Sequence, residues 1–363
     1  MSPLLPKPSP SPLLLRPLLS HPGLPLSLSR RLSTTPSPPP RIPPSSLPSH
    51  SLPPRIFDTH THVSDPLRFP PSGTAQYRPH AAKLADLYAM YRKLGFVDPS
   101  RSVKTVLVQP STYGLDNSCL LHGLEKLTPA RGKGVVVVDP GVRMRGEAEG
   151  ELEELGVWWR GGVGGVRVNL KSIGKTLSPT ELEALIISYA ALLKAAPGGP
   201  WSLQIHADLA SMTALKQCIH HLTSICSVCI DHYGCPTLPR STPPSDPHDA
   251  RNLPGWTDLK SLMQEHNVFV KISAPYRIAG ARGWEDIEEL TRELLAVNGG
   301  KQVLWASDWP HTRFEGKVDV GEFVRRCVQW CDGDSMLVER LFWANAERMW
   351  GEEGRVGWKG KRG

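Results

Sequence analysis

The sequence predicts an α/β fold: a single (β/α)8 barrel of the TIM type, with extra helices at its C-terminal end and a disordered leader before it. Short β-branched runs alternate with longer helical patterns eight times from residue 55 onward, and this alternation is typical of a parallel sheet. Eight such units in about 300 residues fit one barrel. An open doubly wound sheet would need a glycine-rich turn after its first strand, and "DTHTHVSDP" is not one.

The expected strands are short apolar runs rich in Val and Ile. They span residues 56–62, 103–109, 134–139, 163–169, 201–206, 225–232, 268–273 and 302–308. Helices are expected between them near 79–95, 117–127, 147–156, 178–195, 208–223, 255–267 and 283–297, with more helix over 319–349.

The clearest helix signal is "SPTELEALIISYAALLKAA", where Ser178 or Thr180 can cap the first turn and Glu181 lies within it. The stretch 238–253 is rich in Pro, Ser and Asp. It predicts a long loop after the sixth strand that can cover a substrate.

The two ends of the chain differ from its body. Residues 1–54 are rich in Pro, Ser and Leu, contain Arg but no Asp or Glu, and are predicted to be a disordered leader. "SLSRRLSTTPS" is typical of the end of a mitochondrial transit peptide. The many prolines argue against the helix of such a peptide, so a cytoplasmic location is the alternative. The barrel is expected over 55–352 and a basic tail over 353–363.

The formal charge of +7 comes from the ends. Residues 1–55 carry six basic residues and no acid, residues 355–363 carry four more, and the body is therefore 7 − 6 − 4 = −3. A near-neutral body does not indicate nucleic-acid binding. No run of about 20 apolar residues predicts a membrane span. The odd number of cysteines, seven, favours a reducing compartment.

Polar residues close most of the expected strands. In "DTHTH", alternation is expected to place Asp58, His60 and His62 on one face of the first strand. Functional groups of such barrels lie at the C-terminal ends of the strands. The other strand-end residues are Gln109, Arg167, Asn169, His206, Asp231, His232, Lys271, Ser273 and Asp308, with Tyr276 and Arg277 just after the seventh strand. A single such residue has an ordinary structural explanation, but four histidines and an aspartate at one rim indicate a catalytic or metal site.

The motifs "DTHTHV", "VLVQPSTYGLDNS", "GGVRVNL", "CIDHYGCP", "VKISAPYR" and "WASDWPH" follow one another over residues 57–311. In this order they resemble the amidohydrolase superfamily, in the branch that includes 2-pyrone-4,6-dicarboxylate lactonase and sugar lactonases. The resemblance implies a site made of His60, His62, His206, His232 and Asp308. Binuclear members need a bridging Lys or Glu after the fourth strand, where this chain has Arg167 and Asn169, so a two-metal site is not expected.

Two chemistries stay open at this point. One Zn²⁺ held by His60, His62, His206 and Asp308 would lower the pKa of its bound water to about 7. Without a metal, as the resemblance to the dicarboxylate lactonase implies, His60, His62 and His232 polarise a lactone carbonyl while Asp308 accepts the proton of the attacking water. Asp308 handles the proton in both cases.

The expected substrate is a small lactone that carries a carboxylate, because a guanidinium matches a carboxylate in bidentate geometry. Arg277 and Arg167 are the candidates for that contact, and Tyr113, Ser111 and Asn117 could hydrogen-bond the substrate. The alternative is a metal-dependent decarboxylase of an aromatic or muconate-type acid. A non-catalytic barrel ranks last, since all five site residues are present. The sequence leaves the oligomeric state open.

Overall fold

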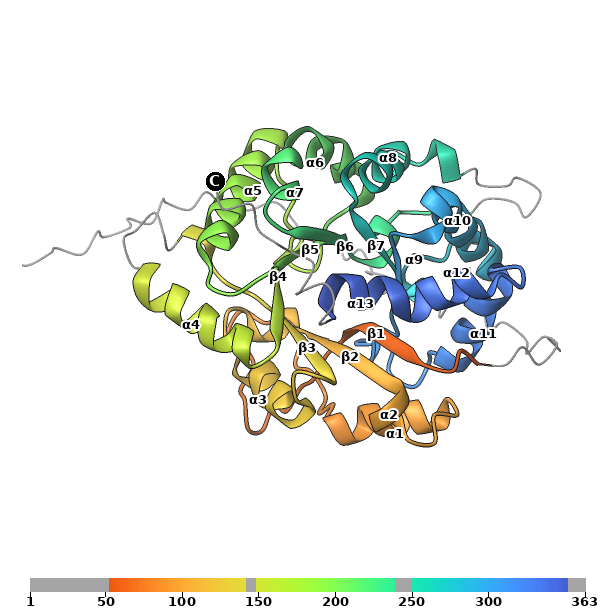
Figure 1. The fold of residues 1–363 in the computed structure, drawn as a ribbon, viewed down its shortest axis with the longest axis horizontal. Coiled ribbons are helices and arrows are strands. Elements are labelled where there is room, and N and C mark those ends of the chain that lie inside the picture. The colour runs from red at the N-terminus through yellow and green to blue at the C-terminus, as the bar shows by residue number, and fades with distance from the viewer. Residues whose placement is uncertain (1–51, 142–147, 239–249, 352–363) are drawn as a thin grey trace, which may run out of the picture. The chain divides into compact units, whose positions relative to one another are not determined.

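The predicted barrel is confirmed. The computed structural model describes residues 52–141, 148–238 and 250–351, and in this part of the chain eight parallel strands pair in sequence order from β1 to β8 (Figure 1). Each strand lies within its predicted run or begins two residues earlier. They are β1 (Ile56–Thr61), β2 (Val103–Val108), β3 (Gly132–Val136), β4 (Val163–Asn169), β5 (Ser202–His206), β6 (Ser227–Ile230), β7 (Phe269–Ile272) and β8 (Val303–Trp305).

Helices surround the strands (Figure 1). The α-helices are α1 (Leu84–Lys93), α2 (Pro99–Ser102), α3 (Ser118–Leu127), α4 (Ala148–Arg160), α5 (Pro179–Ala195), α6 (Met212–Cys218), α7 (His220–Thr223), α8 (Trp256–His266), α9 (Pro275–Ile278), α10 (Trp284–Ala296), α11 (Val320–Trp330), α12 (Ser335–Glu339) and α13 (Asn345–Trp350). The shorter turns are η1 (Ser111–Tyr113), η3 (Leu209–Ser211), η4 (His232–Gly234), η5 (Ala250–Asn252), η6 (Val297–Gly300) and the π-helical η7 (Arg340–Ala344).

Helix α5 begins where the sequence predicts. Ser178 is its N-cap and accepts a hydrogen bond from the backbone N–H of Glu181, while the Glu181 carboxylate accepts one from the Ser178 N–H. This capping box satisfies two backbone donors that a helix start leaves free. The expected helices over 208–223 and 319–349 are instead broken into shorter pieces.

The half of the barrel interior farther from the C-terminal strand ends is apolar and closed by α13. We call it the lower half. Inward-facing side chains from six strands form one buried cluster with Met349 and Trp350 of α13. Gly164 makes room for this helix, because a Cβ there would lie 3.1 Å from the Trp350 ring. The strand residues of the cluster are Phe57, Val106, Val108, Val135, Cys229, Phe269 and Leu304. Water is therefore excluded from beneath the polar groups described below.

The barrel closes between β1 and the segment after β8. The backbone N–H of Asp308 donates to the carbonyl of His60 (3.0 Å), and the N–H of His62 donates to the carbonyl of Trp309 (2.8 Å). These two bonds place the histidines of the first strand directly beside the aspartate of the eighth.

Asp58 does not share a face with His60 and His62, so that expectation is wrong. The register between β1 and β2 shifts between Asp58 and Thr61, which marks a β-bulge with one extra residue in β1. Asp58 faces α1, and its carboxylate accepts a hydrogen bond from the hydroxyl of Tyr91 in that helix (3.0 Å). It accepts a second one from the N–H of Ser307, after β8 (2.9 Å). The bulge turns His60 inward instead.

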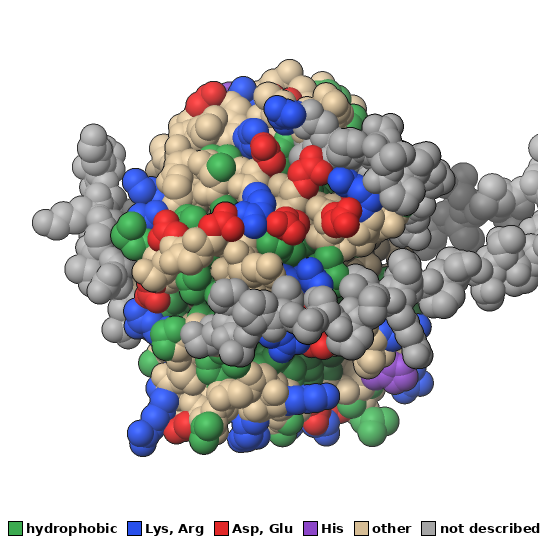
Figure 2. All heavy atoms as spheres, turned by 90° about the vertical axis from the view of Figure 1, so that its right-hand side faces the viewer, with side chains coloured by type: hydrophobic (Ala, Val, Ile, Leu, Met, Phe, Trp, Pro, Cys, Tyr) green, Lys and Arg blue, Asp and Glu red, His purple; other side chains and the backbone are tan. Residues whose placement is uncertain are grey.

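The face that carries α10, α11 and α12 shows acidic and basic side chains intermixed rather than one sign of charge (Figure 2). Arg282 with Glu289, Arg292 with Asp332, and Arg326 with Glu322 are among the ion pairs of these helices. Among the described helices, none is both long and apolar enough to cross a membrane.

Some expectations lie outside the described residues: nearly all of the leader, the basic tail 353–363, and most of the loop expected over 238–253.

Candidate active site

The next inward side chains along the strands, on the C-terminal side of the apolar cluster, are polar. Because alternate residues share a face, Cys229 is followed on the inside by Asp231, and Phe269 by Lys271. Both polar side chains are fully buried, as are those of Gln204 and His60. Buried charges are costly unless they are paired, and here Asp231 lies 3.3 Å from both Lys271 and Arg167.

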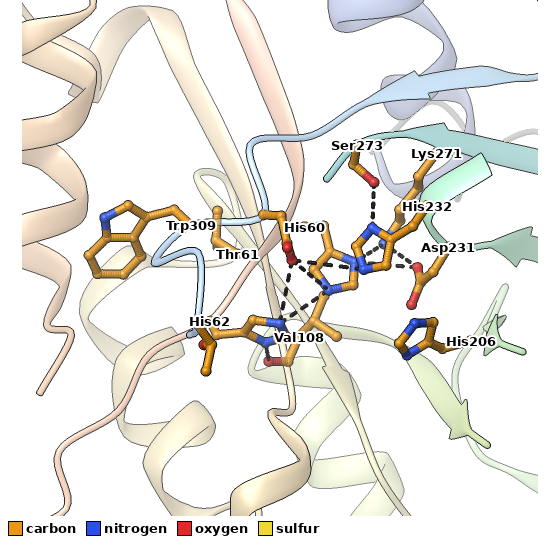
Figure 3. A network of polar contacts seen from close by, with 12 residues as sticks. His60, Thr61, His62, Val108, His206, Asp231, His232, Lys271, Ser273 and Trp309 are labelled. Carbon is orange, nitrogen blue, oxygen red and sulfur yellow. Dashed lines mark hydrogen bonds and ion pairs between the residues drawn. The ribbon is translucent and has the colours of Figure 1, made fainter. Parts of the chain in front are cut away.

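Three histidines meet above this layer. Figure 3 shows the rings of His60, His62 and His232 directed toward one another, and we call them the histidine cluster. The Nε2 atoms of His60 and His62 are 3.2 Å apart. The Oδ1 atom of Asp308 lies 3.8–3.9 Å from the Nε2 atom of each of the three.

The two carboxylate oxygens of Asp308 have different surroundings. Oδ2 accepts hydrogen bonds from the Tyr276 hydroxyl (2.5 Å) and from Nε of Arg277 (3.0 Å), whereas Oδ1 faces the histidine cluster. Burial alone would raise the pKa of Asp308, but the charge of Arg277 and the three histidines outweigh it and hold the pKa well below its ordinary value. Asp308 is therefore an ionised carboxylate with one oxygen directed at the cluster.

The histidines are neutral near pH 7. Burial, with the positive charge of Arg167, lowers the pKa of His62 to about 4. Burial, with the charge of Lys271, holds the pKa of His60 well below its ordinary value, and burial also lowers the pKa of His232. Neutral imidazoles can donate or accept a proton at each nitrogen, depending on the tautomer.

The backbone is strained where two of these residues lie. His232 has φ = 52° and Asp308 has φ = 59°, a left-handed conformation that costs a non-glycine residue on the order of 1 kcal/mol or more. Such strain is concentrated at functional sites, and here it aims two side chains from different strands at one point.

A cavity of about 500 Å³ opens above the cluster. Most of the predicted site residues line it: His62, Ser111, Arg167, His206, His232, Arg277 and Asp308. Its size fits a small ligand. Arg277 is the more exposed of the two arginines, with 32% of its side chain accessible, while Arg167 is buried. Nη2 of Arg277 donates to the Thr312 carbonyl and Nε of Arg277 donates to Asp308. Among the described residues this leaves Nη1 of Arg277 for a ligand.

Tyr113 and Asn117 lie elsewhere, which corrects their placement at the substrate. The Tyr113 hydroxyl is buried and accepts a hydrogen bond from the Asp65 N–H (3.1 Å). The Asn117 side chain bridges to the residue directly after β3, through the N–H (3.0 Å) and carbonyl (2.8 Å) of Val137. Both side chains fix the loop after β2 rather than line the cavity.

His206 is also placed differently from the expected zinc ligand. Its Nδ1 contacts Asn169 Oδ1 (3.0 Å) and Ser172 Oγ (3.2 Å), and its ring lies edge-on to the ring of His232, with the centroids 5.1 Å apart. Among the described residues, the groups whose ligand atoms lie within 4.8 Å of one another are His60 with His62 and Asp308, and His60 with Asp231 and His232. Neither includes His206.

The spacing of the first group suits one zinc ion. Ligand atoms of a tetrahedral zinc lie roughly 3.3 Å apart, because each bond is about 2.0–2.1 Å long. The distances among His60, His62 and Asp308 are 3.2–3.9 Å. Spacing is one requirement, and the other is a lone pair on each nitrogen, which depends on the tautomer.

Four residues of the site have no function predicted from the sequence: Gln204, Asp231, Lys271 and Tyr276. The available signal is a charged or amide side chain inside an otherwise apolar strand run, as in "SLQIH" and "FVKIS". Such residues are buried polar groups that need partners, and all of them contact a site residue.

The comparisons with known proteins support the family and the fold. The model of the family described as amidohydrolase matches residues 57–351. A search of curated proteins gives no significant match.

Solved structures with the same fold include three bacterial proteins. A candidate 2-pyrone-4,6-dicarboxylic acid hydrolase from Pseudomonas putida is 25% identical, with a TM-score of 0.61 over 83% of this chain and 98% of its own. A candidate for the same activity from Acinetobacter baumannii, with citric acid bound, is 22% identical, with a TM-score of 0.62 over 82% and 99%. An amidohydrolase from Burkholderia multivorans with bound zinc is 18% identical, with a TM-score of 0.60 over 82% and 99%.

Proposed function

The chain belongs to the amidohydrolase family, and from this premise we propose that it is a hydrolase that opens a small lactone bearing a carboxylate. The observation that carries the proposal is the ionised Asp308, whose Oδ1 faces the neutral histidine cluster beside a cavity lined by Arg277. A proton acceptor, groups that can polarise a carbonyl and a cation for a carboxylate are thus within one site.

In the proposed reaction, water attacks the lactone carbonyl carbon while Oδ1 of Asp308 accepts its proton. An N–H of the histidine cluster donates to the carbonyl oxygen, which becomes negative as the new C–O bond forms. The ring C–O bond then breaks, and the proton held by Asp308 passes to the departing ring oxygen. The products are a hydroxyl group and a second carboxylic acid, which releases its proton to the solvent to become a carboxylate, so atoms and charge balance.

Tyr276 and Arg277 keep Asp308 in position for this step. Because both donate to Oδ2, the carboxylate cannot rotate freely, and Oδ1 is the oxygen that meets the water. The remaining Nη1 of Arg277 can contact the substrate carboxylate, and the positive charge of buried Arg167 lies at the wall of the same cavity.

The name of the Pseudomonas putida relative supports a 2-pyrone-4,6-dicarboxylate-like substrate, because it is a candidate hydrolase of that compound and is 25% identical over most of both chains. The metal-dependent decarboxylase remains the second candidate. It requires His60 and His62 to offer lone pairs to a metal. The distance of 3.2 Å between their Nε2 atoms permits this.

Asp308→Asn tests the proposal. We expect ring opening of 2-pyrone-4,6-dicarboxylate and of related carboxylated lactones, followed by absorbance, to fall by about 10²–10⁴-fold, the usual contribution of a general base. The fold should persist, because Asn keeps the shape of the side chain. Asp332→Asn is the matched control: the same change at an exposed carboxylate paired with Arg292.

Near-normal turnover by Asp308→Asn would contradict the assignment of the base. Failure of the wild-type protein to open any carboxylated lactone, together with release of CO₂ from an aromatic acid, would favour the decarboxylase.

A further inference from the structure

Lys271 is a fully buried lysine in direct contact with a member of the histidine cluster. Its Nζ donates to Gln204 Oε1 (2.6 Å) and to His60 Nδ1 (3.1 Å). We infer that Lys271 is a positioning residue that holds His60 as the tautomer with its proton on Nε2, and thereby disfavours zinc at the histidine cluster.

The amide orientation of Gln204 is fixed by its two partners. Oε1 accepts from Lys271, and Nε2 donates to Asp231 Oδ2 (3.0 Å). The group of Gln204 that faces His60 Nδ1, at 3.4 Å, is therefore the donor Nε2. A lysine ammonium has donors and no acceptor, so both groups in hydrogen-bonding position at Nδ1 of His60 are donors.

Asp231 is the acceptor that could favour the other tautomer. Its Oδ1 lies 3.3 Å from His60 Nδ1, but this oxygen has no partner in hydrogen-bonding geometry among the described residues. This contact favours a proton on Nδ1, but it is longer than the 3.1 Å between Nδ1 and Nζ of Lys271, and the nearer lysine can only donate. Nδ1 of His60 is thus an acceptor, and a neutral imidazole must then carry its proton on Nε2.

The contacts of His62 agree with this assignment. Its Nδ1 lies 2.7 Å from the Val108 carbonyl, which can only accept, so His62 carries its proton on Nδ1 and a lone pair on Nε2. Nε2 of His62 lies 3.2 Å from Nε2 of His60 and accepts a hydrogen bond from it. The donors run in one direction, from Lys271 to His60 to His62 to Val108 (Figure 3).

A zinc ion would need a lone pair on Nε2 of both histidines. With Lys271 in place, Nε2 of His60 carries a proton, and moving this proton to Nδ1 would set an N–H against the Lys271 ammonium. The charges of the contacting side chains act in the same sense: Lys271, Arg167 and Arg277 are cations, against the carboxylates of Asp231 and Asp308. The distances fit zinc, but the proton and the charge balance do not.

This inference deepens the proposed function and rests on it in one respect: it assigns the polarisation of the lactone carbonyl to the histidine cluster itself, without a metal. The binding of zinc and the tautomer are measured without substrate. A wrong substrate class would therefore leave their outcome unchanged.

The first experiment compares zinc affinity of the full-length wild type, Lys271→Met and Lys260→Met by competition with a chromogenic chelator. Met has a similar length without a donor or charge, and Lys260 is a surface lysine paired with Glu293 on α10. We expect Lys271→Met to bind zinc about 10-fold to 100-fold more tightly, the scale on which outer-sphere partners act. Lys260→Met should match the wild type.

The second experiment needs no folded variant at position 271. In wild-type protein with ¹⁵N-labelled histidine, the nitrogen shifts of His60 should show Nε2 protonated and Nδ1 unprotonated. A signal from the opposite tautomer would overturn the inference, as would zinc affinity of the wild type equal to that of a folded Lys271→Met variant.

Discussion

Asp308 shows how one residue is specialised by its contacts. Arg277 and Tyr276 occupy one carboxylate oxygen and leave the other for the reaction. The same arginine keeps the carboxyl group ionised, and burial keeps the facing histidines neutral. The protonation states that lactone opening requires are thus stable over a wide range of pH.

A pH profile tests this at the residue scale. The pKa of Asp308 lies well below its ordinary value and that of His62 is about 4, so the active forms are lost only as the pH falls toward 4. We expect kcat/KM for a carboxylated lactone to stay level from pH 8 to about 5 and to decline below. A decline centred near 6.5, the ordinary value of histidine, would contradict these environments.

At the scale of elements, the bulge in β1 decides which side chains enter the site. Phe57 packs inside the barrel, and without the bulge alternation would turn Asp58 and His60 outward together. The extra residue lets Asp58 join β1 to α1 and to the segment after β8, while His60 turns inward. Burial raises the pKa of Asp58 from 3.8 to about 6.

This raised pKa predicts the effect of Asp58→Asn. A carboxyl group whose pKa is higher in the folded than in the unfolded protein destabilises the fold increasingly as the pH rises from 3.8 to 6, by about 3 kcal/mol in all. Asn is neutral and retains an oxygen for the Ser307 N–H. We expect the variant to gain free energy of unfolding in urea titrations, and to gain more at pH 8 than at pH 5.

The gain should be absent in Asp332→Asn, whose carboxylate is exposed and paired with Arg292. A loss of stability in Asp58→Asn that is equal at both pH values would show that the ionised carboxylate contributes hydrogen bonds worth more than its burial costs.

At the scale of the whole molecule, the barrel separates an apolar lower interior, closed by α13, from a polar upper one. The described part of the chain begins with Leu52, which packs against the core, and Pro53, which is buried. We therefore propose that residues 52–54 contribute to the stability of the barrel expected from residue 55 onward.

Two truncations test this boundary. Deletion of residues 1–51 is expected to leave the Tm unchanged, because the composition of that stretch cannot form a core. Deletion of residues 1–54 should lower the Tm by a few degrees, since about 1 kcal/mol of lost packing corresponds to roughly 2–4 °C in a domain of this size. Differential scanning calorimetry measures both, and an equal Tm for the two would place the boundary after Pro54.

The sequence by itself determined the barrel, the order of its strands and the rim where its polar residues gather, because periodicity and strand ends are local properties of the chain. Only the tertiary structure decided the rest. A single bulge moved Asp58 to the other face, a left-handed turn aimed His232 at Asp308, and Lys271 of β7 met His60 of β1. These contacts join residues as far apart as 211 positions, and local patterns carry no information about such distances.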